Sequence, residues 1–476
     1  MSAAEREPVA PQGLDPGSFR DRGSRVVTGA KGIYRLLGER AAEEWKALSA
    51  TKFYERFRSA EQVVATQEAD LSPSLRSHAG GPWKAALRHE AVPFVSYPYE
   101  WSFSMLRRAA LLQLELLDAA LVEGMTLKDA SPFNVQWIGA RPVFIDVASF
   151  ERWRPGEAWT AYRQFCQLYL YPLLLDAYKG VAFQPWLKGS LEGIDPADFS
   201  RLMSWRDLMR PGVLVHGVLQ ARMSACHAGS ERNVRRELRD AGFGSELIRA
   251  NVRRLLRLIQ RLTPRRAASA WSDYTSQHGY AASELAQKEQ FVRRAVMARP
   301  RRLVWDLGCN RGFFSRVAAE AADYVVAVDA DQATVDLLFG ELERESHGRI
   351  LPLVGDMADL SPARGWRGRE RKSLWDRGRP DLTLALALVH HLVIRANIPL
   401  GELVEWLASL EGDVVVEFVT KDDPKVRALL RNKDDQYADY SREQFEAHLA
   451  RWFRIAAREE LGSRTRILYH AELNRR

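Results

Sequence analysis

The chain has 476 residues, of which 46% are hydrophobic and 27% are charged, and its formal net charge is +8. It is too long for one ordinary hydrophobic core, so two or three globular domains are expected. The three cysteines, Cys166, Cys226 and Cys309, show no paired spacing, which excludes a disulfide framework and a zinc site of the usual spacing.

Two segments bear on location. Residues 1–16 are polar and lack the apolar core of a signal peptide, so export is not expected. The most apolar stretch, residues 109–122, is interrupted by Glu115 and Asp118 and is too short and too charged to span a bilayer. We therefore expect a cytoplasmic protein that has no membrane partner.

The positive charge allows two interpretations. It can reflect solvated faces of an arginine-rich chain, or it can indicate an acidic partner such as a phosphorylated substrate or a nucleic acid. Basic residues are spread along the chain, with higher density at 232–266 and 364–379. This spread does not indicate a dedicated nucleic-acid domain.

The first half of the chain predicts an α+β arrangement. Residues 17–95 predict short strands and helices, and residues 101–123 carry apolar side chains at helical spacing. Residues 134–138 and 142–147, separated by Gly139, predict a tight β-hairpin. Residues 157–262 are mostly helical in pattern, with a basic amphipathic helix pair at 231–266. We therefore expect a small lobe at 1–95, a mainly helical lobe at 96–266, and a further domain at 267–476, whose pattern is clear from about Trp271.

The last domain shows alternating strand and helix patterns from Arg301 onward. Helical patterns lie between the first five strands, and a short turn at 461–463 joins the last two. The expected strands are 303–306, 324–329, 350–354, 382–386, 413–418, 453–459 and 465–470. Five β/α units followed by a closing hairpin predict an α/β fold with a Rossmann-like seven-stranded sheet.

A glycine-containing turn follows the first of these strands. After Asp306 come Gly308, which permits a tight turn, and Gly312, which permits close approach of the next helix. The N-terminus of that helix favours a negative group. Such a turn alone fits either a nicotinamide dinucleotide or S-adenosylmethionine (SAM).

The residues around this turn resemble the class I SAM-dependent methyltransferases over roughly 270–476. Asp329 ends the next strand, 23 residues after Asp306, where an acidic residue can accept from two ribose hydroxyls. Asp356 and Met357 follow the third strand, where they can contact the adenine. The resemblance implies SAM as the cofactor, held by Asp306, Gly308, Asn310, Gly312, Asp329, Asp356 and Met357.

The methyl-transfer site is expected at the end of the fourth strand. His390 and His391 lie there, and either can deprotonate an incoming hydroxyl or amine, or simply cap the strand. Glu417, at the end of the fifth strand, can act as a base, orient the substrate or bind solvent. A metal held by these three side chains is an alternative, although no fourth ligand shows a recognisable spacing.

Two further segments could face a substrate. The basic run at 361–372, which contains Trp366, predicts either a solvated helix or a clamp for a phosphate or carboxylate with an aromatic ring to stack on. After the fifth strand, a polar and aromatic loop contains Asp434, Asp435, Tyr437 and Tyr440.

In the first half, Asp129 is followed at the fifth position by Asn134 and, 12 residues later, by Asp146. This spacing resembles the catalytic core of the protein-kinase-like and aminoglycoside-phosphotransferase-like folds. The resemblance implies that Asp129 is a base toward a hydroxyl, and that Asn134 and Asp146 hold Mg²⁺ on ATP phosphates.

The chain departs from the kinase pattern in several places. Leu127 and Lys128 replace the usual residues before Asp129, and the glycine-rich loop is missing. Arg35 with Glu43 or Glu44 would stand in for the lysine–glutamate pair. These departures leave open whether the domain transfers phosphate or only positions substrate.

The whole chain also resembles a bacterial group of methyltransferases related to a rhizobial nodulation protein, on residues 127–136, 159–165, 306–315 and 384–392. Three interpretations remain open. The first is a SAM-dependent methyltransferase that acts on an oxygen or nitrogen of a small molecule or glycan and carries a kinase-like domain. The second is a bifunctional kinase–methyltransferase. The third is an RNA-associated methyltransferase.

Overall fold

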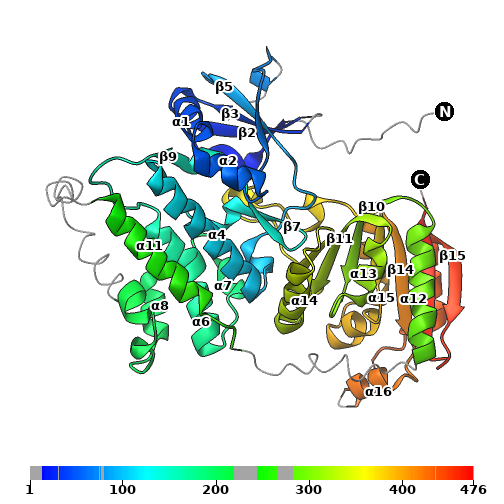
Figure 1. Ribbon diagram of the computed structural model, residues 1–476. Coiled ribbons are helices and arrows are strands. Elements are labelled where there is room, and N and C mark those ends of the chain that lie inside the picture. Colours follow the sequence, from blue (N-terminus) through cyan, green and yellow to red (C-terminus); the bar gives the residue numbers. More distant parts are fainter. Residues whose placement is uncertain are drawn as a thin grey trace.

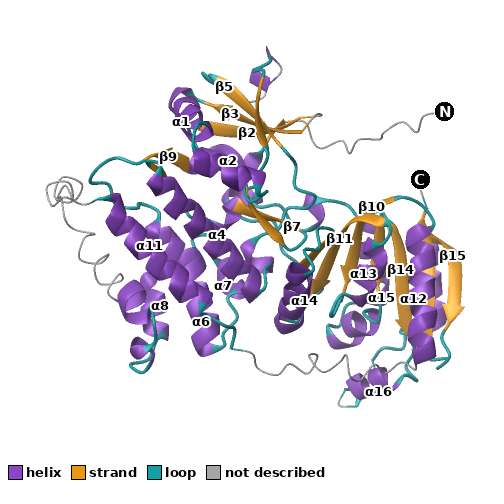
Figure 2. Cartoon of the chain, viewed as in Figure 1, coloured by secondary structure: helices purple, strands orange, loops and turns teal. Residues whose placement is uncertain are grey.

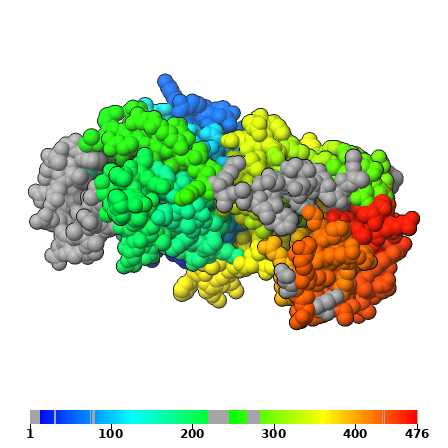
Figure 3. Space-filling view, turned by 90° about the horizontal axis from the view of Figure 1, so that it is seen from below, coloured from blue at the N-terminus to red at the C-terminus, as the bar shows by residue number. Residues whose placement is uncertain are grey.

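The computed structural model describes residues 13–29, 32–73, 75–76, 80–218, 244–265, 282–431, 433–434 and 436–474. The chain forms two halves that lie side by side (Figure 1), and each half has a sheet of its own (Figure 2). Seen from below, the helical part of the first half and the C-terminal residues form opposite ends of the molecule (Figure 3).

The first half begins with an antiparallel sheet of order β1-β2-β3-β5-β4. Its strands are β1 (Gly13–Leu14), β2 (Ser24–Gly29), β3 (Gly32–Leu37), β4 (Thr66–Ala69) and β5 (Ala85–His89). The helices α1 (Glu39–Ser49) and α2 (Lys52–Ser59) lie between β3 and β4, and they bury aromatic side chains such as Trp45 and Phe53. The predicted mixture of short strands and helices at 17–95 is confirmed.

A long buried helix, α4 (Phe103–Val122), follows the sheet. The Ser102 hydroxyl caps it by accepting from the Met105 N–H, and most of its side chains are buried on several faces. This confirms the helix predicted at 101–123. The surrounding helices are α5 (Tyr162–Phe165), η5 (Cys166–Leu170), α6 (Tyr171–Lys179), α7 (Gln184–Gly189), α8 (Pro196–Leu202) and α11 (Ser245–Gln260).

Two small antiparallel pairs complete this half. The pair β6 (Met125–Leu127) and β9 (Phe150–Arg152) lies next to the predicted hairpin, which is confirmed as β7 (Val135–Ile138) and β8 (Arg141–Phe144). The strand β8 ends at Phe144, earlier than predicted, because the next residues leave the ladder for the turn η4 (Val147–Ser149).

The second half has a seven-stranded sheet of order β12-β11-β10-β13-β14-β16-β15. The first five strands in the chain run parallel, and the last two form an antiparallel hairpin at one edge. The strands are β10 (Arg301–Leu307), β11 (Ala322–Asp329), β12 (Ile350–Val354), β13 (Leu382–Ala385), β14 (Asp413–Val419), β15 (Phe453–Glu460) and β16 (Arg466–Leu473). All seven predicted strands are therefore confirmed.

Helices flank this sheet. They are α12 (Ala282–Met297), α13 (Phe313–Ala319), α14 (Gln332–Arg344), α15 (Leu400–Ser409), α16 (Pro424–Leu430) and α17 (Arg442–Trp452). Three of them, α13 to α15, connect successive parallel strands. β10 and β13 are neighbours in the sheet, and the order of the strands reverses between them, because β11 and β12 lie on the β10 side and β14 lies on the β13 side. Ligands of open parallel sheets bind at such a reversal, beside the carboxyl ends of the strands.

The two halves share one buried apolar cluster. The β7–β8 hairpin turn docks on the second half, where the Gly139 N–H donates to the Tyr324 hydroxyl at 2.9 Å. A buried ion pair joins Arg377 to Glu100, and the Ser104 N–H donates to Asp336 at 2.7 Å.

Some predictions lie outside the described residues. These are the boundary at 266–267, Trp271, and the first helix of the pair expected at 231–266. The described helix of that pair is α11. Among the described helices, none combines the length and the apolar character that a bilayer crossing needs.

Candidate functional site

A pocket of about 340 Å³ lies at the carboxyl ends of β10, β11, β12 and β13. Each of these strands ends in residues that line it. They include Gly308 and Asn310 after β10, Asp329 to Asp331 at the end of β11, Gly355 to Ala358 after β12, and Leu386 to Leu388 with His391 after β13. The pocket therefore lies at the strand-order reversal, where the fold predicts a ligand.

The turn after β10 forms one wall of the pocket. Gly308 has φ +76°, in the left-handed region that favours glycine, and its N–H donates to the Val328 carbonyl at 2.8 Å. Asn310 has φ +49°, which is uncommon for a residue with a side chain. This hydrogen bond and the two torsions turn the backbone of residues 308–310 toward the cavity.

Gly312 serves packing and does not line the pocket. It has φ +73° at the start of α13, and a Cβ on it would lie 2.7 Å from Leu338 Cδ1. The sequence correctly predicts a close approach of the helix here, but the assignment of Gly312 as a cofactor contact is corrected, because the residue faces α14.

Asp329 presents a carboxylate that is already partly engaged. Its Oδ2 accepts from the Asn310 N–H at 2.8 Å, and its Oδ1 accepts from the Asp331 N–H at 2.9 Å. Burial raises the pKa of this carboxyl. The Ala330 backbone N–H also contributes to holding the carboxylate. Since each carboxylate oxygen has two lone pairs, acceptor capacity remains for a ligand.

Asp356 and Met357 lie in the turn after β12 and line the same pocket as Gly308 and Asp329. The Asp356 Oδ1 accepts from the Ala358 N–H at 2.9 Å, which fixes the turn. The two acidic residues predicted on separate strands are thus brought to one cavity.

Asp306 lies beneath the pocket. Its side chain is buried, and its Oδ2 accepts from the Ser315 hydroxyl at 2.5 Å. Burial raises its pKa to about 6. The assignment of Asp306 as a direct cofactor contact is corrected, because its side chain points to α13. It joins β10 to that helix and so positions the turn.

His391 lines the pocket, and its neighbour His390 does not. The two rings pack against each other with centroids 4.2 Å apart. Burial lowers the pKa of His391 to about 4, with Arg395 and Lys425 adding to the effect, and lowers that of His390 to about 3. Both imidazoles are neutral near pH 7, but only His391 reaches the cavity.

Glu417 is fully buried away from the pocket. Its Oε2 lies 2.5 Å from Lys288 Nζ, and its Oε1 lies 3.3 Å from Arg466 Nη1. The hypotheses that Glu417 binds solvent, substrate or a metal are corrected, because its carboxylate is held by two cations. In the described part of the chain, no three His, Cys, Asp or Glu side chains are grouped to hold a metal ion.

Three features of the pocket could not be predicted from sequence motifs. Asp331 caps α14 by accepting from the Ala333 N–H at 2.9 Å, and it also lines the pocket. Ala387 has φ +52°, a strained backbone that is typical of ligand sites. Arg395 lies exposed at the pocket wall. The only sequence signal for these residues is that they follow strand ends.

A second pocket, of about 650 Å³, lies between the small sheet and the helical part of the first half. Asp129, Asn134 and Asp146, which the sequence pattern singles out, all line it together with Lys128. The Asn134 amide donates to Asp129 Oδ2 at 3.0 Å. Burial and the nearby Asp146 raise the pKa of Asp129.

Arg35, on β3, also lines this second pocket. It pairs with Asp146 at 2.9 Å rather than with Glu43 or Glu44. Glu44 accepts from the Arg152 N–H at 2.9 Å instead. The expected pairing of Arg35 with Glu43 or Glu44 is therefore wrong, because Glu44 faces β9 and Glu43 is exposed.

The segments expected to face a substrate do not line the first pocket, but Arg371 of the run 361–372 lines the second. The run 361–372 does not form a helix; Arg364 and Arg371 pair in an isolated β-bridge, and Trp366 is 67% exposed at its tip. The Tyr440 hydroxyl donates to the Val419 carbonyl at 2.6 Å, and Tyr437 is also buried. Asp434 is exposed, and Asp435 lies outside the described residues.

The chain was compared with known proteins. No family model matches it. Among solved structures, the N-methyltransferase NodS from Bradyrhizobium japonicum WM9 is 12% identical, with 41% of this chain and 98% of that chain covered and a TM-score of 0.30. WbdD is 20% identical, with 40% of this chain and 39% of that chain covered and a TM-score of 0.29.

A whole-length relative is also found. Nodulation protein NoeA of Rhizobium meliloti (strain 1021) is 33% identical over 475 residues, which cover 99% of each chain. Since this match extends over both halves, the chain belongs to the family of the nodulation protein NoeA.

Proposed function

We propose that the pocket at the ends of β10–β13 binds SAM and that the protein transfers its methyl group to an oxygen or nitrogen of a small molecule or glycan. One observation carries the proposal. A left-handed glycine turn and two carboxylates, Gly308, Asp329 and Asp356, line one cavity at the strand-order reversal. A turn of close backbone approach and an acidic residue at the end of the next strand are the features that bind an adenosine with its ribose.

The residues of the pocket fit this cofactor in three places. Asp329 keeps acceptor capacity for the ribose hydroxyls, and Asp356 and Met357 line the same pocket and are proposed to contact the adenine. The backbone of Gly308 and Asn310 borders the remaining space. When bound, SAM would supply an activated methyl group on a sulfonium.

The chain's own residues then hold the acceptor and its proton. His391 is the titratable side chain of the β13 end that lines the pocket, and its lowered pKa keeps the ring neutral and able to accept a proton. Arg395 lies at the same wall and suits an acidic or phosphorylated acceptor. Much of the acceleration would come from positioning the acceptor in line with the methyl group.

The test is calorimetric titration of the full chain with SAM and S-adenosylhomocysteine. Gly308→Arg should abolish binding of both, because the new side chain fills the cavity. Unaltered affinity in that variant would remove the assignment. His391→Asn should keep the affinity and slow the transfer of radiolabelled methyl groups. For a hydroxyl acceptor, transfer by the wild type should fall only as pH approaches about 4, since that is where His391 gains its proton.

A second function, phosphotransfer, is favoured by the second pocket. Asp129, Asn134 and Asp146 converge there in the arrangement that the kinase-like resemblance implies. Asp129 would accept the proton of an acceptor hydroxyl, and Asn134 with Asp146 would hold Mg²⁺ on ATP phosphates. Titration with ATP and MgCl₂ tests this function: the wild type should bind and Asp146→Asn should not. A wild type that does not bind ATP would leave methyl transfer as the sole proposed activity.

A further inference from the structure

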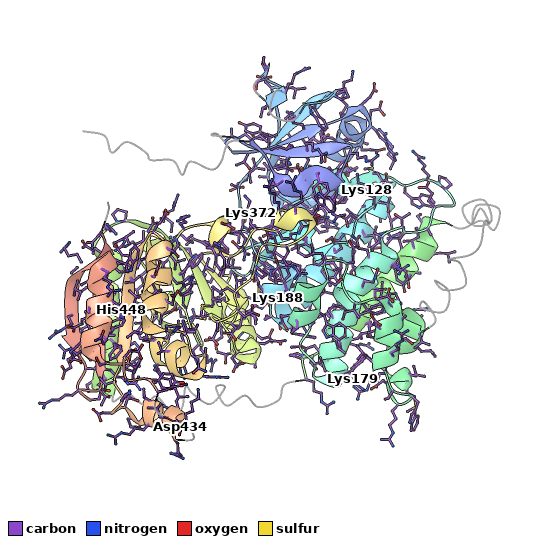
Figure 4. The ribbon with its side chains drawn as sticks, turned by 180° about the vertical axis from the view of Figure 1, so that it is seen from behind. Lys128, Lys179, Lys188, Lys372, Asp434 and His448 are labelled. Carbon is purple, nitrogen blue, oxygen red and sulfur yellow. The ribbon has the colours of Figure 1, made fainter. Side chains whose placement is uncertain are left out.

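The second pocket is built from both halves of the chain. Most of its walls come from residues before 150, but Glu370 and Arg371 also line it, and they belong to the second half. Both lie on the bridging segment, residues 356–377, which connects the end of β12 to the stretch before β13. Figure 4 labels Lys372, which belongs to this segment, and shows both it and Lys128 below the small sheet.

Several contacts hold the bridging segment against the first half. Glu370 accepts from Arg20 in a two-point ion pair, at 3.0 and 2.8 Å. The backbones of Gly17 and Glu370 also approach closely, since a Cβ placed on Gly17 would lie 2.7 Å from the Glu370 carbonyl oxygen. Further contacts are Lys188 with Asp359 at 2.7 Å, Arg364 with the Gly189 carbonyl at 2.9 Å, and the Lys372 N–H with the Tyr97 hydroxyl at 2.9 Å. The position of Arg371 is therefore fixed from both sides.

Arg371 differs from the other arginines around this pocket. Arg20 and Arg35 are ion-paired to carboxylates, whereas in the described part of the chain no carboxylate pairs with Arg371. Its guanidinium lies over the Phe133 ring, 4.3 Å from the centroid. Among the residues that the structure describes, its buried Nε finds no hydrogen-bond partner, and its Nη1 donates only to the adjacent Glu370 carbonyl at 3.2 Å.

A buried guanidinium donor without an acceptor costs free energy, which a bound anion would remove. A second unpaired polar atom lies in the same pocket: His89 is 6% exposed, and its Nε2 has no hydrogen-bond partner in the described ranges. Stacked, planar and always charged, Arg371 has the geometry that binds a phosphate at two points. Phe133, beneath it, is the residue immediately before Asn134, and Arg371 and this predicted metal ligand line the same pocket.

We propose that Arg371 binds a phosphate group of a nucleoside triphosphate in the second pocket, so that the methyltransferase half completes the site of the other half. The inference rests on the second function proposed above. It also places one continuous segment at both pockets, because Asp356 and Met357 line the first and Arg371 lines the second.

The experiment titrates ATP with MgCl₂ into the full chain and into three variants. Arg371→Met keeps the stem over Phe133 and removes the guanidinium, and it should bind about tenfold to a hundredfold more weakly. Arg371→Lys keeps the charge without the planar fork and should be intermediate. Arg369→Met, an exposed arginine on the same segment, should bind like the wild type.

Affinity for S-adenosylhomocysteine separates a binding defect from misfolding, because Arg371 does not line the first pocket. It should be equal in all four proteins. If the wild type binds ATP and Arg371→Met binds it equally well, the role of Arg371 is refuted while phosphotransfer stands. If the wild type binds no ATP, both proposals are refuted.

Discussion

Asp329 offers a sharp test of the cofactor pocket. Both of its oxygens already accept a backbone N–H, from Asn310 at 2.8 Å and from Asp331 at 2.9 Å, so the carboxylate is held in one orientation. Two ribose hydroxyls would each donate to it. A hydrogen bond to a charged group contributes about 1.5–3 kcal/mol, so the two bonds set an upper range of about 3–6 kcal/mol.

Two substitutions at Asp329 separate the contribution of both carboxylate oxygens from that of one. Asp329→Ala removes both acceptors, and affinity for S-adenosylhomocysteine should fall by about a hundredfold or more. Asp329→Asn keeps one oxygen and places an amide NH₂ against one of the backbone donors. It should weaken binding by about tenfold or more, which is the loss of one such bond.

Asp323 provides the matched control. It lies exposed near the start of β11, at the opposite end of the strand that Asp329 ends, and Asp323→Asn makes the same chemical change far from the pocket. Calorimetry should give wild-type affinity for this variant. If a folded Asp329→Ala protein bound S-adenosylhomocysteine as tightly as Asp323→Asn, the assignment of Asp329 to the ribose would be wrong.

Two further predictions concern the contact between the halves. Glu100 and Arg377 are 3% and 1% exposed, so Arg377→Met leaves a buried carboxylate uncompensated and should lower the free energy of unfolding in urea by about 3–5 kcal/mol. Adding Glu100→Gln should recover part of this loss, and no recovery would argue against the pairing as its cause. Gly139→Ala places a Cβ 2.2 Å from the His347 carbonyl oxygen, whereas Gly124→Ala meets nothing within 4 Å, although both glycines have positive φ. Both variants should lose about 1–2 kcal/mol to backbone strain, and Gly139→Ala should melt at a clearly lower temperature than Gly124→Ala. Equal melting temperatures would contradict this close contact.

Much of the second half can be predicted from sequence because its signals are local. Most of the parallel strands are short buried runs followed by a turn and a helix, although only short 3-10 turns follow β12, so the strands are visible one at a time. The turn at Gly308 and the acidic ends of β11 and β12 follow such runs directly. Since parallel strands end at one edge, the shared location of Asp329 and Asp356 follows from the pattern.

The direction in which each side chain points is less predictable. Asp306, Gly312 and Glu417 stand in the expected motif positions, but they face α13, α14 and a pair of buried cations respectively. The partners that decide the role of Glu417 are Lys288 and Arg466, which are 129 and 49 positions away in the chain. Motif spacing carries no information about such a partner.

The amino-acid sequence by itself determined the order of strands and helices, the glycine turn and the acidic strand ends, because hydrophobic periodicity and turn chemistry act between near neighbours. Only the tertiary structure decided that His391 and not His390 reaches the pocket, and that Arg371 enters the site of the other half. The physical reason is that these outcomes depend on packing between distant segments, such as Arg20 against Glu370 across 350 positions, whose geometry is set only when the halves come together.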